Sequence, residues 1–177
     1  MISRLFIYIV LFLFLAVPAL SVNSQEVQIE GKKNVEYNLK YPGIMRDHPL
    51  YFLKKIRDQL NLFLTRDYVK KAELLLQISD KNINSALLFS QSGKWGLSTK
   101  SAYDGEQDFM KIFPFLSQSK KQGVSPSQDF ILTLKLSNEK HQEVIETIFK
   151  DVPQGERSLL SEVLNVNKKA KNELKRF

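Results

Sequence analysis

Residues 49–90 read PLYFLKKIRDQLNLFLTRDYVKKAELLLQISDKNINSALLFS, and this stretch decides the fold. Apolar side chains recur in it at steps of three and four residues, the spacing of one face of an α-helix. The pattern predicts one helix over 49–64 and a second over 67–90. So few residues join them that they must pack as an antiparallel hairpin. The faces expected to be buried comprise Leu50, Leu53, Ile56, Leu60, Phe63 and Leu64, and then Tyr68, Ala72, Leu75, Leu76, Ser79, Ile83, Ala86 and Leu87.

Three further helices are expected downstream, over 98–121, over 126–150 and from 155 or 156 to 176. The first of them contains Gly105 and Pro114, and a proline inside a helix removes one hydrogen bond, so we expect a kink or a break before Pro114. In the second, Ser125, Pro126 and Gln128 form the pattern of a capping box. Four to five amphipathic helices with short links predict an all-α bundle with a leading helix hairpin.

The first 24 residues, MISRLFIYIVLFLFLAVPALSVNS, have the three parts of an export signal. Arg4 is followed by an unbroken apolar run over 5–17, and then by Pro18 and small residues. We expect either a cleaved signal peptide or an uncleaved signal anchor that contacts the membrane. The predicted organisation is a signal over 1–24, an extended arm over 25–46 and a helical bundle domain over 47–177. The expected location is extracytoplasmic: secreted, periplasmic or membrane-anchored.

The composition narrows the classes of function. The 177 residues include no cysteine, which excludes disulfides, thiolate metal sites and a thiol nucleophile. The formal charge of +7 suggests attraction to anionic phospholipid or wall polymer, although lysine-rich helix faces also serve solubility alone. Export makes nucleic acid an unexpected partner for this charge.

No catalytic or metal-binding pattern stands out in the sequence. The two histidines, His48 and His141, are far apart and neither lies in a metal motif. The glycines are scattered singly, so a phosphate-binding loop is absent, and so is the Gly-x-Ser-x-Gly elbow. Paired carboxylates remain open, because any two acidic residues can meet in a fold. We therefore expect a protein that is not an enzyme and has no cofactor.

Three stretches carry a resemblance to a known family. Residues 41–58 read YPGIMRDHPLYFLKKIRD, residues 62–67 read LFLTRD, and KAEL follows at 71–74. Together they resemble a bacterial domain family of unknown function, with the pattern Pro-Gly, Asp-x-Pro-Leu-Tyr-x-x-Lys and Leu-Thr-x-Asp. The resemblance implies an extracytoplasmic helical domain and supplies no activity.

The same stretches supply five candidate binding or motif-locking residues. Asp47 or His48 is expected to cap the first helix, and Pro49 sits in its first turn. Tyr51, Lys54 and Arg57 are expected at the entrance of the hairpin. The leading hypothesis is a non-enzymatic envelope module that binds an envelope protein or an anionic envelope component. The alternatives are a periplasmic-type helical chaperone or stress sensor, and a wall hydrolase that uses paired carboxylates.

Overall fold

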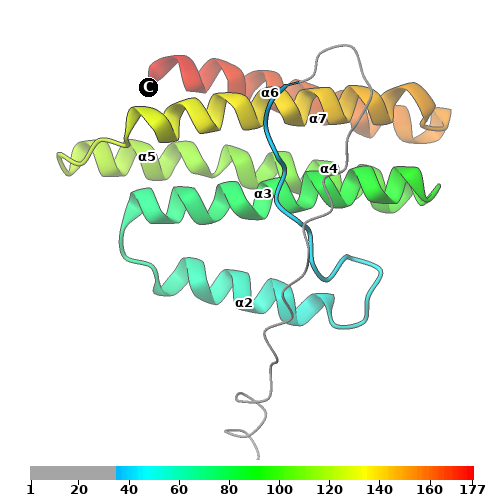
Figure 1. Ribbon diagram of the computed structural model, residues 1–177, viewed down its shortest axis with the longest axis horizontal. Coiled ribbons are helices and arrows are strands. Elements are labelled where there is room, and N and C mark those ends of the chain that lie inside the picture. The colour runs from blue at the N-terminus through cyan, green and yellow to red at the C-terminus, as the bar shows by residue number, and fades with distance from the viewer. Residues whose placement is uncertain (1–34) are drawn as a thin grey trace, which may run out of the picture.

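The computed structural model of the protein describes residues 35–177, so the signal expected over 1–24 and the beginning of the arm lie outside the described residues. Within 35–177 the chain is helical without a strand, and it folds as a bundle with a leading hairpin, which confirms the predicted fold class (Figure 1). The elements are α2 (Tyr51–Leu64), α3 (Tyr68–Gln91), α4 (Trp95–Met110), α5 (Ile112–Lys121), α6 (Gln128–Asp151), a 3-10 turn (Gln154–Glu156), α7 (Arg157–Glu173) and a final 3-10 turn (Leu174–Arg176).

The third predicted helix is broken, as its proline indicates. α4 ends at Met110 and α5 begins at Ile112, with Lys111 between them in an α-helical conformation. Pro114 is the third residue of α5, where the missing N–H interrupts no hydrogen bond of the helix interior. Both segments lie against α3 (Figure 1). The bundle therefore has five helical segments if α4 and α5 count as one interrupted helix.

Two of the predicted helix caps are wrong. α6 is capped by Ser127, whose Oγ accepts the N–H of Phe130 at 3.2 Å, so the cap lies two residues after the predicted Ser125. α2 begins at Tyr51 without a side-chain cap. His48 Nδ1 instead accepts the N–H of Leu50 within the preceding turn, at 3.1 Å.

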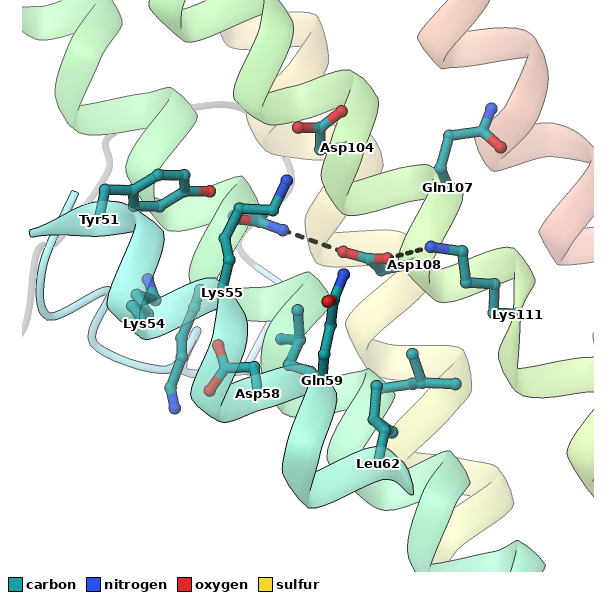
Figure 2. Close-up of a pocket in the computed structure, with 14 residues that line it drawn as sticks. Tyr51, Lys54, Lys55, Asp58, Gln59, Leu62, Asp104, Gln107, Asp108 and Lys111 are labelled. Carbon is teal, nitrogen blue, oxygen red and sulfur yellow. Dashed lines mark hydrogen bonds and ion pairs between the residues drawn. The ribbon is translucent and has the colours of Figure 1, made fainter. Parts of the chain in front are cut away.

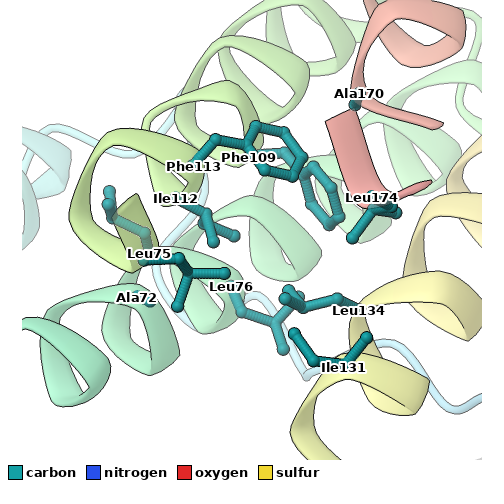
Figure 3. Packing of buried hydrophobic residues seen from close by; sticks show 11 residues of the cluster. Ala72, Leu75, Leu76, Phe109, Ile112, Phe113, Ile131, Leu134, Ala170 and Leu174 are labelled. Carbon is teal, nitrogen blue, oxygen red and sulfur yellow. The ribbon is translucent and has the colours of Figure 1, made fainter. Parts of the chain in front are cut away.

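The core is layered along the bundle axis. Two clusters of apolar side chains fill its two ends, and α3, α4/α5, α6 and α7 contribute to both. Figure 3 shows the cluster at the end where Phe109, Phe113 and Leu134 meet. Between the clusters each of the four helices contributes buried polar side chains, so apolar, polar and apolar layers follow one another. This polar layer comprises Ser79, Asp80, Glu106, Ser137, Asn138, His141 and Asn167.

The first helix is turned the opposite way from the prediction. α2 lies on the outside of the bundle along α3 (Figure 1), and its apolar stripe points to solvent. The side chain that α2 buries best is that of Lys54. The pattern identified correctly which residues share a face of α2, but the other helices already close the core. The exposed residues are Leu50, Phe52, Leu53, Ile56, Leu60, Phe63 and Leu64, each at least 46% exposed.

The arm from residue 35 to α2 is held to the bundle by hydrogen bonds. The N–H of Val35 donates to Glu143 Oε2 at 3.0 Å, and Asn84 Nδ2 donates to the carbonyl of Lys40 at 3.1 Å. Tyr37 OH donates to Asp80 Oδ2 at 2.6 Å and so joins the arm to the polar layer. None of the helices in 35–177 has both the length and the apolar character that a membrane span needs.

Gly105 of α4 lies directly against α3, close to Asn82 and Ile83. A Cβ atom there would lie 3.0 Å from Ile83 Cδ1 and Cγ1 and 3.3 Å from Asn82 Cβ. We expect Gly105→Ala to cost about 1–3 kcal/mol through overpacking, which outweighs the gain of up to about 1 kcal/mol in helix propensity. In Gly96→Ala, the control on the same helix, the new atom meets only Glu156 Oε1, at 3.6 Å. Urea unfolding should show a lower midpoint for the first variant and an equal or higher one for the second. Equal midpoints for the two variants would contradict this packing.

Candidate functional site

The polar layer is built around His141, which lies between two carboxylates. Its Nδ1 is 2.9 Å from Glu106 Oε1 and its Nε2 is 3.1 Å from Asp80 Oδ1. Ser137 Oγ also donates to Asp80 Oδ1, at 2.8 Å, and Asn167 Nδ2 donates to Glu106 Oε1 at 3.3 Å. The cluster therefore ties α3, α4, α6 and α7 together through side chains.

His141 is held in its charged form. Burial alone lowers its pKa, but the hydrogen bonds and negative charges of Asp80 and Glu106 outweigh this effect and raise the pKa to about 9. The side chains of all three residues are wholly buried, so a substrate in solvent cannot reach them. Across residues 35–177 no group of His, Asp and Glu side chains has an arrangement that could hold a metal ion. The cluster therefore lies inside the core, away from the surface of the domain.

A cavity of about 230 Å³ separates α2 from α3 and α4 (Figure 2). Tyr51 and Leu62 line it from α2, Ile78 from α3 and Asp108 from α4. Its other walls are formed mostly by polar residues with both signs of charge, and we call this cavity the seam between α2 and the bundle. The remaining lining residues are Lys54, Lys55, Asp58, Gln59, Leu75, Lys81, Asn82, Asp104, Gln107 and Lys111.

The acidic groups of this seam already have partners in the protein. Asp108 accepts from Lys111 Nζ at 2.7 Å and from Asn82 Nδ2 at 3.2 Å (Figure 2). Burial nevertheless raises the pKa of Asp108 above its usual value. Asp104 is paired with Arg46 and, at 2.6 Å, with Lys100. These pairs account for the carboxylates of α4 without a ligand.

The structure brings together two of the five candidate residues from the sequence. Lys54 Nζ lies 5.6 Å from the centre of the Tyr51 ring and donates to the carbonyls of Pro42, at 2.7 Å, and Ile44, at 3.1 Å. Burial lowers the pKa of Lys54 to about 8. This pair locks the arm against the start of α2.

The other three candidates lie apart from that pair. Asp47 does not cap α2 but pairs with Lys94 at 2.6 Å, and this hydrogen bond lowers the pKa of Asp47. Arg57 is exposed and pairs with its neighbour Asp58 at 2.7 Å. Pro49 precedes the first residue of α2 by two positions.

The apolar face of α2, which the sequence predicted to lie in the core, forms an exposed surface that we call the outer face of α2. The outer face of α2 consists of Phe52, Leu53, Ile56, Leu60, Phe63 and Leu64. Eleven large hydrophobic residues are exposed in 35–177. Nine of them lie on α2 or shortly before it: the six of the outer face, Leu50, and Tyr41 and Ile44 of the arm. The apolar exposure of the described domain is thus concentrated on one element. Concentrations of this kind mark interaction sites.

The sequence alone also did not identify three members of the polar layer, Asp80, Glu106 and Asn167. The signal that could have found them is the interruption of each apolar stripe at the same level of the bundle. Asp80 falls between Leu76 and Ile83, and Glu106 between Ala102 and Phe109. A single helix shows only that a polar residue lies near its apolar stripe. The topology is needed to tell which polar residues of different helices lie at the same level of the bundle.

Fold and surface together define a small all-α domain with a polar layer in its core and one helix that presents its apolar face to solvent. The chain belongs to the family described as Domain of unknown function (DUF5667), whose sequence model matches residues 43–176. This match confirms the expectation of a domain family without an assigned function. Comparisons with curated proteins and with solved structures give no significant match.

The buried histidine should make stability depend on pH. Because the pKa of His141 is about 9 in the folded chain against 6.5 when unfolded, its contribution is complete below pH 6.5 and is lost as the pH rises through 9. The free energy of unfolding should fall by about 2 kcal/mol between pH 6.5 and 8. Above pH 8 the lowered pKa of Lys54 acts in the opposite direction.

Urea unfolding at intervals of half a pH unit measures this slope. NMR titration of His141 in the unaltered chain gives its pKa directly, and this pKa should lie near 9. A constant free energy together with a pKa near 6.5 would contradict the charged cluster.

Lys54 and Lys55 offer a matched pair of substitutions. Lys54→Met removes both hydrogen bonds to the arm and should cost about 1–3 kcal/mol, whereas Lys55 is exposed and Lys55→Met should change stability by less than about 0.5 kcal/mol. Limited proteolysis should cut residues 41–46 faster in the first variant only. Equal cleavage rates in the two variants would show that Lys54 does not hold the arm.

Proposed function

We propose that the chain is an exported, non-enzymatic helical domain of the bacterial cell envelope, and that it binds another envelope component through the outer face of α2. The single observation that carries this proposal is the exposure of this face, from 48% at Leu53 to 80% at Phe63. Contact with water costs each of these side chains roughly 1.5–3 kcal/mol relative to full burial. The domain gains no core packing from them, which favours a role in binding.

The segment that resembles the family motif, residues 41–58, overlaps this surface at Phe52, Leu53 and Ile56. It includes the arm held by Lys54 and the first two turns of α2. We infer that its pattern of residues preserves the orientation of α2, with the charged side toward the bundle and the apolar side outward. Export is supported by the residues of the leader, with Arg4 ahead of the apolar run 5–17.

The absence of enzymatic activity is supported by the state of the acidic groups. The one His–carboxylate cluster of the described chain has no exposed atoms, and the acids of the cavity are paired with Lys and Arg. A wall hydrolase needs two accessible carboxylates with separated pKa values. The buried cluster has no accessible carboxylate, and in the cavity Asp104 and Asp108, whose pKa values are shifted in opposite directions, are each engaged by Lys or Arg.

The alternative role of a chaperone or stress sensor uses the same surface. Exposed aromatic residues such as Phe52 and Phe63 favour it, but an unfolded client is usually held in a groove, and a single helix on the outside of a bundle is a ridge. Suppression of the aggregation of a model protein by the unaltered chain, lost in Phe63→Asp, would favour this alternative.

In-cell photo-cross-linking tests the proposal. A photoreactive amino acid is placed at Phe63, and in a control chain at Leu132, which is 56% exposed on α6. Position 63 should give adducts with a specific protein, polymer or lipid outside the cytoplasm, and position 132 should not. No adducts at position 63, or the same adducts at both positions, would contradict a binding role for this face. Recovery of the chain from the cytoplasm would contradict export.

A further inference from the structure

We infer that the component bound by the outer face of α2 is a phospholipid bilayer with anionic headgroups, in whose surface α2 lies. This inference rests on the proposed function and names its partner. Successive residues of a helix are about 100° apart and rise about 1.5 Å each, so the outer face spans an arc of about 120° and a length of about 18 Å. A helix with such a face and a charged opposite side is the kind that lies in a membrane interface.

The shape of the surface favours a bilayer over a folded partner. α2 is a ridge on the outside of the bundle, and the cavity lies between it and the helices behind it, α3 and α4 (Figure 2). The apolar rows of a ridge can enter the acyl region by about 5–10 Å while the basic and polar residues stay in the headgroup layer. Phe63 and Phe52 project from the two ends of this row, and they are 80% and 57% exposed.

A bilayer places no minimum on the area of the face, whereas a stable interface with a second copy of the chain buries about 800 Å² on each partner. In a bilayer the helix needs only to bury its own apolar side chains.

The charges around α2 favour an anionic surface. Residues 46–67 contain five Lys or Arg and three Asp. Asp47 and Asp58 each form an ion pair, with Lys94 and Arg57, and the segment as a whole has more basic than acidic residues. The side chains of Lys55 and Arg66 are exposed. Each cation near an anionic membrane surface contributes about 1 kcal/mol, or about fivefold in partitioning.

The chain contains no cysteine, so a single engineered cysteine can carry an environment-sensitive dye. The full chain is labelled in the variant Phe63→Cys and, as a control, in Leu132→Cys. Both are mixed with vesicles of phosphatidylglycerol and phosphatidylcholine, and with vesicles of phosphatidylcholine alone. The leader contributes equally to the binding of both proteins, so the difference between the two dyes reports on α2.

With phosphatidylglycerol vesicles, the fluorescence emission of the dye at position 63 should shift to the blue and become more intense. The emission of the dye at position 132 should not change. Replacing Lys55 and Arg66 with Gln in the labelled chain should lower partitioning about fivefold per charge. The same response at both positions, or none at either, would overturn the inference. So would a blue shift at position 63 that needs no vesicles and grows with protein concentration, because it would indicate a second copy.

The two proposals can fail separately. If the vesicles give no shift but Phe63 is cross-linked to one protein in cells, the binding module stands and the bilayer is the wrong partner. If neither experiment gives a contact at Phe63, both proposals fail.

Discussion

The structure depends on the ion pairs that His141 makes with Asp80 and Glu106 in the middle of the bundle. A buried charge is costly unless it is paired and hydrogen-bonded, so these three side chains have to meet. Because Asp80, Glu106 and His141 come from α3, α4 and α6, and Asn167 adds α7, they fix the register of four helices at once. The two apolar clusters fill the space on either side and supply most of the burial.

The orientation of α2 follows from this closed arrangement. The bundle offers α2 a mostly polar surface, in which Lys, Asp, Asn and Gln side chains surround Leu75 and Ile78. The charged side of an amphipathic helix fits such a surface better than its apolar side. Lys54 fixes the choice, because its ammonium group finds two carbonyls of the arm beneath the helix. The arm in turn reaches the polar layer through Tyr37, which links the core to the position of α2.

Much of the fold was predictable from the sequence. The number of helices, the hairpin formed by α2 and α3, and the interruption near Pro114 all follow from periodicity and from the chemistry of proline. The direction of the α2 face was not predictable, because periodicity shows which residues share a face and not what that face contacts. The Asp80–His141–Glu106 cluster also stayed hidden, since its members are far apart in sequence and meet only through the topology. Of the five candidate residues, Tyr51 and Lys54 lie together at the start of α2, and the apolar residues that we propose as a binding surface were assigned to the core.

Hydroxyl-radical footprinting of the isolated domain at low concentration tests the central claim most directly, which is that α2 turns its apolar face to water while the bundle closes without it. Phe63, at 80% exposure, should be oxidised at close to the rate of a free phenylalanine, and Phe109, which is fully buried, should be protected. Protection of Phe63 as strong as that of Phe109 in a monomeric sample would contradict the account. It would mean that α2 packs its apolar face into the domain.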